Sequence, residues 1–136
     1  MSTLLLLAAI SLAGSAGAAA RYLLDQTLGR RGSPGTLPPG TLAVNLAGAF
    51  AAGLATGWLG VDPAGVFSPG APLAPIVLVG FLGAFTTFST WMVETIALAE
   101  GGHGRAAAAN LALTLVGGLA LAVAGVALGS ALGPGL

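Results

Sequence analysis

Four long apolar stretches run through the chain, and short segments rich in glycine, proline and charge separate them. The stretches cover approximately residues 4–28, 39–59, 75–99 and 106–128. Because about 20 apolar residues span the hydrocarbon core of a bilayer, each stretch is long enough to cross a membrane as a helix. The pattern therefore predicts an all-α membrane protein whose residues 1–136 form a single transmembrane domain of four helices.

Small residues recur within these stretches at helical spacing. In a membrane, helices associate through close packing, and glycine and alanine let two backbones approach each other. We therefore expect close helix contacts along one face of three of the four helices. The residues concerned are Gly14, Gly17 and Ala20 in the first, Ala49, Gly53 and Gly57 in the second, and Gly125 and Gly129 in the fourth.

The third stretch departs from this apolar pattern in its middle. Between Gly80 and Trp91 it holds two glycines, a run of aromatic residues and four hydroxyl residues in five positions. Glycine is a weak helix former, and Thr and Ser compete for backbone hydrogen bonds. We predict that the helix breaks near Gly83 to Thr86 and then resumes. The carbonyl groups exposed by such a break need partners, which a cation or a neighbouring helix could supply.

Composition supports the membrane assignment and narrows the function. The chain is 56% hydrophobic and 6% charged, with a mean hydropathy of +0.98. A water-soluble surface needs more polar residues than this. Four arginines balance four acidic residues, which favours no nucleic-acid partner, and the absence of cysteine excludes disulfides and thiol chemistry. The one histidine, His103, lies in a glycine-rich turn, where we expect it to be solvated.

The first stretch could also be a signal peptide, with alanines 18–20 as the cleavage site. No arginine or lysine precedes it, the stretch is long, and Arg21 and Tyr22 continue its helical pattern, so we favour a membrane helix. Four crossings place the arginines at 30–31 and Arg105 on one side and no basic residue on the other. This bias favours both termini outside the cytoplasm.

Polar side chains at membrane depth form two short tracks. Thr41 and Asn45 are four residues apart on the second helix, and Asn110 and Thr114 are four apart on the fourth. Each pair could join helices by hydrogen bonds, or could line a path for an ion or a polar solute. The residue types alone leave both interpretations open.

The aromatic residues after the predicted break alternate with hydroxyls. Phe88 and Trp91 share one helix face, and Ser89 and Thr90 lie between them. An aromatic ring has a positive edge that can face an anion, and hydroxyl groups can donate hydrogen bonds to it. Because conduction needs binding that replaces water yet releases the ion, such a lining suits a small, strongly hydrated anion.

Two ionisable residues lie within the predicted helices. Arg21 is near the end of the first helix, where it could anchor the helix at the interface or attract an ion. Glu94 is four residues from Thr90 and could be a proton-coupling carboxylate, although one carboxylate is weak support for that role. The sequence has no Ser-His-Asp set, phosphate-binding loop or cluster of metal-ligating side chains, so we do not expect an enzyme.

These residues resemble the Fluc (CrcB-type) fluoride channel family. Three segments carry the resemblance: residues 14–22 in the first helix, 40–48 in the second and 80–90 in the third. The resemblance extends over the whole chain in the number and spacing of helices. It implies small four-helix subunits that pair antiparallel as a dual-topology dimer, with two fluoride pores along the interface. The partner subunit could be an identical chain or a related one.

The resemblance also implies roles for individual residues. A structural sodium ion would be held by backbone carbonyls of Gly83 and Thr86 from both subunits. The fluoride pathway that the resemblance implies contains the pore asparagine, the pore-facing aromatic pair, hydroxyls near the pore centre and polar residues of the fourth helix. In this sequence, the residues that the resemblance gives are Asn45, Phe88, Trp91, Ser89, Thr90, Thr114 and Asn110. We add Thr41, which shares a helix face with Asn45, and Arg21, which could attract the ion, to the expected pathway. Trp91 stands where the family has phenylalanine, and Asn110 where it often has an aromatic residue.

We therefore predict a passive fluoride channel in the inner membrane of a bacterium, where it lowers cytoplasmic fluoride. One alternative is a small four-helix multidrug-type exchanger, which needs a deep carboxylate in its first helix, and none lies between Leu4 and Ala20. A second alternative is a structural membrane subunit that conducts nothing.

Overall fold

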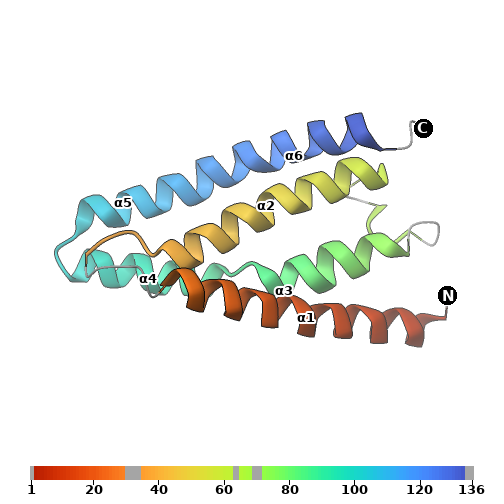
Figure 1. The fold of residues 1–136 in the computed structure, drawn as a ribbon, viewed down its shortest axis with the longest axis horizontal. Coiled ribbons are helices and arrows are strands. Elements are labelled where there is room, and N and C mark those ends of the chain that lie inside the picture. The colour runs from red at the N-terminus through yellow and green to blue at the C-terminus, as the bar shows by residue number, and fades with distance from the viewer. Residues whose placement is uncertain (1, 30–34, 63–64, 69–71, 134–136) are drawn as a thin grey trace.

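The computed structural model describes residues 2–29, 35–62, 65–68 and 72–133. These residues form an elongated bundle of long helices that run up and down, with both termini at the same end (Figure 1). The first two crossings are single helices, and the third and fourth each consist of several segments. The elements are α1 (Thr3–Gly29), α2 (Pro39–Leu59), η2 (Pro75–Leu82), α3 (Gly83–Phe85), α4 (Phe88–Glu100), α5 (Gly104–Ala112), η3 (Leu113–Gly117) and α6 (Gly118–Leu132), where η marks a π-helical segment.

The four expected crossings are confirmed as four helical spans of sufficient length and hydropathy. The fourth span starts at Gly104 and ends at Leu132, so it is longer than the expected 106–128. At its start, the Gly101–Gly102 turn is short enough that α5 takes in Gly104 and Arg105. At the end of α2, Gly60 adopts a left-handed conformation (φ 59°, ψ 30°) that glycine accommodates at little cost.

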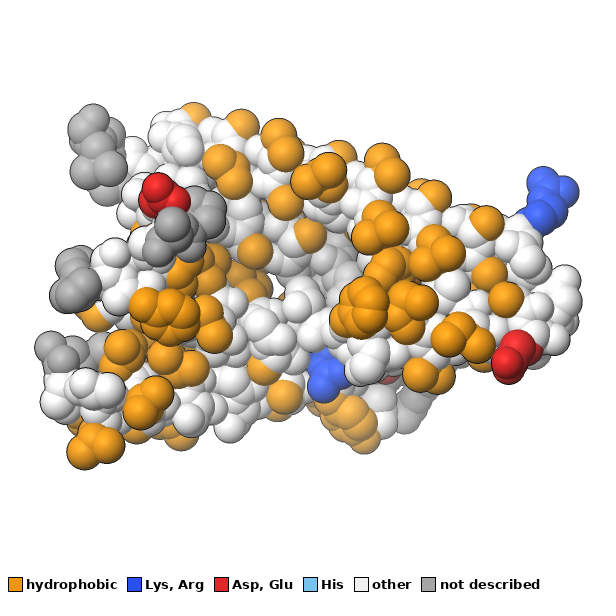
Figure 2. Space-filling model, turned by 180° about the vertical axis from the view of Figure 1, so that it is seen from behind, with side chains coloured by type: hydrophobic (Ala, Val, Ile, Leu, Met, Phe, Trp, Pro, Cys, Tyr) orange, Lys and Arg blue, Asp and Glu red, His pale blue; other side chains and the backbone are white. Residues whose placement is uncertain are grey.

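The outer surface of the bundle is apolar along its length. Figure 2 shows hydrophobic side chains over the long face of the molecule, with charged groups mostly toward its ends. Leu4 on α1 and Val116 on η3 are 79% and 70% exposed. An apolar surface of this extent is stable against lipid chains and unstable against water. The chain is therefore a multi-pass membrane protein.

The expected contacts through small residues are confirmed. A Cβ atom at Gly17 would clash with the backbone of Phe81, and one at Gly80 would lie 2.8 Å from the carbonyl oxygen of Ile10. These glycines let α1 and η2 pack backbone against backbone. Gly53 and Gly125 do the same between α2 and α6, the pair with the most extensive packing in the described chain.

The third crossing is broken, as predicted, but the break lies slightly later than its composition suggested. Gly83 is helical (φ −63°, ψ −34°), and the backbone leaves the helix at Thr86 (φ −80°, ψ 161°) and Thr87 (φ −146°, ψ 124°). Both glycines, Gly80 in η2 and Gly83 in α3, remain helical despite their weak helix propensity. The break occurs instead where threonine side chains can cap a new helix.

The break also changes what the third crossing packs against. Before it, η2 and α3 lie mainly against α1, whereas α4 lies mainly against α5 after it. The two halves of the crossing therefore belong to two different helix pairs (Figure 1). This arrangement brings α2 alongside the non-helical residues between them, where polar groups of the backbone need partners.

Candidate functional site

The polar backbone of the break is paired with the side chain of Asn45 on α2. The amide Nδ2 of Asn45 donates to the carbonyl oxygen of Thr87 at 2.9 Å, and Oδ1 accepts from the N–H of Thr87 at 2.9 Å. A side-chain amide has one donor group and one acceptor, so it can pair both backbone groups of a single extended residue. For Thr87, the neighbouring helix rather than a cation is therefore the partner.

Threonine side chains restart the helix after the break. The hydroxyl of Thr87 accepts from the backbone N–H of Thr90 at 3.3 Å and donates to the hydroxyl of Thr90 at 3.0 Å. Thr87 thus caps α4 in the way that hydroxyl residues commonly cap helices. On the other side of the break, the hydroxyl of Thr86 donates to the carbonyl oxygen of Leu82 at 3.0 Å. The positive end of the α4 dipole consequently lies within the membrane-spanning bundle.

A groove of about 400 Å³ opens beside the break. It gathers six of the residues that the sequence singled out, from α2, from the third crossing and from η3: Asn45, Gly83, Thr86, Phe88, Trp91 and Thr114. The hydroxyl of Thr114 is buried and has no hydrogen-bond partner among the described residues. The Phe88 side chain is 71% exposed. The groove is therefore mostly apolar, with a few polar groups available along it.

A smaller cavity of about 130 Å³ lies on the other side of Thr87. Its lining includes Arg21, Thr41 and Thr90, three further residues of the predicted set. Thr41 is 2% exposed and its hydroxyl lies near the carboxyl group of Glu94, whereas the Nε of Arg21 has no hydrogen-bond partner in the described part of the chain. Since Thr87 lines both this cavity and the groove, the break separates two spaces that contain unpaired hydrogen-bond donors.

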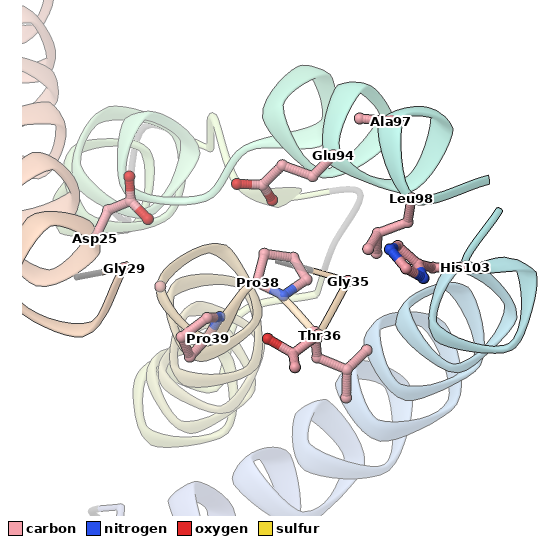
Figure 3. A pocket seen from close by; sticks show the side chains of 12 residues that line it. Asp25, Gly29, Gly35, Thr36, Pro38, Pro39, Glu94, Ala97, Leu98 and His103 are labelled. Atoms are coloured by element: carbon pink, nitrogen blue, oxygen red, sulfur yellow. The ribbon is translucent and has the colours of Figure 1, made fainter. Parts of the chain in front are cut away.

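The small cavity adjoins a wider pocket of about 460 Å³ at one end of the bundle (Figure 3). Asp25 lines both spaces. In Figure 3, the carboxyl groups of Asp25 and Glu94 reach from two different helices toward the space between them. Glu94 lies near the hydroxyl of Thr41. Asp25 is not among the predicted site residues, and it comes into the site because the start of α2 packs beside the end of α1.

His103 lies on the same pocket as these carboxylates. It is exposed, as expected from its glycine-rich turn. Its imidazole ring also lies directly against Gly35, where an added Cβ would meet the ring. The histidine thus packs the turn before α5 onto the segment that leads into α2, a contact that the sequence alone did not indicate.

Two of the predicted pathway residues also hold helices together. The indole Nε1 of Trp91 donates to the backbone carbonyl of Asn110 at 3.3 Å, and Asn110 Nδ2 donates to the hydroxyl of Thr95 at 2.8 Å. Trp91 is 4% exposed and Asn110 is fully buried. The structure therefore supports the first of the two interpretations of Asn110, in which it joins helices by hydrogen bonds. Ser89 is exposed and lies outside the linings of the groove and the small cavity.

The two aromatic side chains after the break contact each other. The ring centroids of Phe88 and Trp91 are 5.5 Å apart, and the planes meet at 75°. This edge-to-face geometry is favoured by the charge distribution of aromatic rings. Trp91 is held from behind by α5, and Phe88 rests against it on the open side of the groove.

The described residues contain no group of three or more His, Cys, Asp or Glu side chains that could hold a metal ion. A cation bound here would need backbone oxygen atoms. Gly83 and Thr86 both line the groove, and the extended backbone at Thr86 removes its carbonyl from the regular helical pattern. Backbone oxygen atoms of this kind are the ligands that a hard cation prefers.

A family model and several curated relatives match most of this chain, and all of them point to one family. The family model described as CrcB-like protein, Camphor Resistance (CrcB), matches residues 8–126. A protein of Streptomyces avermitilis named fluoride-specific ion channel FluC 3 is 44% identical over 123 residues, covering 90% of this chain and 57% of the relative. FluC 1 of Symbiobacterium thermophilum is 42% identical over 127 residues, and FluC 2 of Natronomonas pharaonis is 44% identical over 124 residues. The matches cover 88% and 91% of this chain and 94% of each of these two relatives.

Proposed function

This chain belongs to the CrcB-like family, and from that premise we propose that it is a passive channel selective for fluoride. Hydrogen fluoride enters a cell as a neutral molecule and dissociates at cytoplasmic pH, which traps the anion inside. A channel returns the anion down its gradient and so lowers cytoplasmic fluoride without an energy source. The protein is not an enzyme.

The observation that carries this proposal is the set of unpaired donors on both sides of the break. Arg21 and Thr41 line the small cavity and Thr114 lines the groove, and Arg21 Nε and the Thr114 hydroxyl are buried without a hydrogen-bond partner among the described residues. A buried donor without a partner costs free energy, so a row of them calls for a ligand that accepts hydrogen bonds. A small anion accepts from all of them and can replace its hydration shell stepwise.

The proposed path runs from the small cavity, past Thr90 and the break, into the groove beside Phe88. Arg21 attracts the anion at the first step, and hydroxyl groups take over from water in the cavity. In the groove, the exposed ring of Phe88 offers its positive edge. Neutral donors and ring edges bind an anion weakly enough to release it, which a channel requires.

We further propose that the groove is closed by a second subunit in antiparallel orientation, either an identical chain or a related one. Phe88 is 71% exposed beside the break, on a groove that one chain leaves open. A two-fold partner would present its own broken helix to the same place, because a two-fold interface uses one patch twice. Membrane lipid would cover the remaining apolar faces.

A structural sodium ion is the third part of the proposal. The carbonyls of Gly83 and Thr86 from two subunits would supply four oxygen ligands on the two-fold axis. Such an ion would join the two broken helices at the centre of the dimer. It would be structural, since the proposed anion path uses side-chain donors on either side of the break.

The proposed location is the bacterial inner membrane. The arginine bias favours an orientation of this chain with both termini outside the cytoplasm, which a related partner would match with the opposite orientation, whereas two identical chains would have to insert both ways. Arg105 lies at the start of α5, at the end of the bundle opposite the termini. Arg30 and Arg31, which also support this orientation, lie outside the described residues. Basic residues favour the cytoplasmic side of a membrane.

Efflux from liposomes tests the proposal. Purified protein is reconstituted in vesicles loaded with potassium fluoride or potassium chloride, and efflux after addition of valinomycin is followed with ion-selective electrodes. We expect rapid efflux of fluoride and little of chloride. Proton-coupled export of a cationic dye without fluoride efflux would instead favour the exchanger. Absence of both would favour a structural subunit, provided that co-expression with a related subunit from the same genome also gives no efflux.

A further inference from the structure

We infer that Thr95, a residue outside the proposed path, positions the aromatic pair of the groove. This inference rests on the proposed channel function. Thr95 is 5% exposed and lines neither the groove nor the small cavity. Its hydroxyl holds Trp91 against α5, and Trp91 in turn sets the orientation of the Phe88 ring that faces the anion.

Three hydrogen bonds form a closed ring around Thr95. Its hydroxyl donates to the backbone carbonyl of Trp91 at 2.7 Å and accepts from Nδ2 of Asn110 at 2.8 Å. The indole Nε1 of Trp91 completes the ring by donating to the backbone carbonyl of Asn110 at 3.3 Å. The ring joins α4 to α5 at the level of the aromatic pair, and Thr95 is the member that both donates and accepts through one side-chain atom.

The Thr95 hydroxyl is the partner of the buried Asn110 amide, and no other described residue pairs with that side chain. Asn110 is fully buried, and its Oδ1 has no hydrogen-bond partner in the described part of the chain. If the hydroxyl were removed, the amide Nδ2 would lose its partner as well. A buried amide with both ends unpaired is strongly disfavoured, so Asn110 would reorient. Its backbone carbonyl would then move away from the indole.

Movement of the indole would reach the groove directly. Trp91 and Phe88 meet edge to face, with ring centroids 5.5 Å apart. Trp91 is the aromatic contact of Phe88 within the described chain, so the position of the indole helps to set the orientation of the Phe88 ring. A rotated Phe88 would turn its negative face toward the path in place of its positive edge.

The decisive variants are Thr95→Val, which keeps the shape of the side chain and removes the hydroxyl, and Thr95→Ser, which keeps the hydroxyl. Thr56→Val on α2 is the matched control. The hydroxyl of Thr56 donates to the carbonyl of Ala52 at 2.8 Å, four residues earlier, just as Thr95 donates to Trp91, but it has no hydrogen bond to a second helix among the described residues. Fluoride efflux is measured at equal amounts of monodisperse protein. We expect Thr95→Val to slow efflux about tenfold, as loss of one buried interaction would. Thr95→Ser and Thr56→Val should remain near the unmodified rate.

A spectroscopic measurement separates positioning from simple destabilisation. The chain has two tryptophans, so in a Trp58→Phe background the fluorescence reports Trp91 alone. Thr95→Val should shift this emission to longer wavelength, and Thr95→Ser should not. In an Asn110→Ser background, where the amide is already absent, adding Thr95→Val should slow efflux no further. If Thr95→Val does not fold, Asn110→Ser alone tests the same hydrogen bond, and we expect it to slow fluoride efflux about tenfold as well.

The outcomes separate this inference from the proposed function. If the unmodified protein carries no fluoride, the channel proposal fails, and the inference falls with it. If the unmodified protein conducts but Thr95→Val retains both its efflux rate and its Trp91 emission, the inference is overturned while the channel remains. A lowered melting temperature with unchanged efflux and emission would likewise overturn it, because Thr95 would then act only on stability.

Discussion

Replacing Asn45 with leucine should destabilise the break in the third crossing. The leucine side chain has a similar volume but cannot pair with the N–H and C=O of Thr87, which Asn45 binds at 2.9 Å each. Each buried backbone group left without a partner costs about 1–3 kcal/mol. The expected loss is therefore about 2–6 kcal/mol, a large part of the 5–15 kcal/mol that stabilises a typical domain.

The free energy of unfolding can be measured in bicelles by steric trapping, with pairs of biotin tags on the third crossing and α2. Thr56→Val serves as the control, since it removes a hydroxyl from the same helix without depriving another helix of a partner. We expect the control to cost less than 1 kcal/mol, about the net value of one hydrogen bond. An Asn45→Leu protein as stable as the control would refute the assignment of Asn45 as the partner of the break.

Three further results are expected. Gly17→Val should lower the free energy of unfolding by about 1–3 kcal/mol, because the added atoms clash with the backbone of Phe81. The melting temperature measures this loss, with Gly104→Ala as the control because an added Cβ there meets nothing within 4 Å. Phe88→Ile should slow fluoride efflux at least tenfold yet leave the helix content and the yield of folded protein unchanged, because within one chain the ring is 71% exposed. A loss of folded protein would instead assign Phe88 to packing. Stripping bound sodium, verified by elemental analysis, should abolish efflux until sodium is restored, and full efflux from sodium-free protein would exclude the proposed ion.

The sequence predicted the helices well because hydropathy over some 20 residues is a local property. It also predicted the break, which lies at the end of the predicted region, at Thr86 and Thr87. Gly83 remains helical, whereas Thr87 caps α4 through the N–H of Thr90. Thr87 was the better local signal, since a threonine whose side chain can accept from the N–H three residues later is typical of a helix start.

Features that depend on the packing of distant segments were harder to predict. Asn45 and Asn110 have the same side chain and were given the same two possible roles, yet one pairs with the break and the other ties α5 to α4. Asp25 was not selected, because nothing within its own helix indicates that the start of α2 and Glu94 share its pocket. Such choices depend on which neighbour a side chain meets, and a single sequence contains little information about that.

The pairing of Asn45 with Thr87 has a consequence for how the protein is made. Asn45 lies 42 residues before Thr87, so during synthesis α2 leaves the ribosome first. When the third segment enters the bilayer, the amide that its broken backbone requires is already present in the membrane. Until the two meet, the segment can cross as one continuous helix with its backbone satisfied internally. The kink would then be acquired after insertion, as the newly made helices find one another.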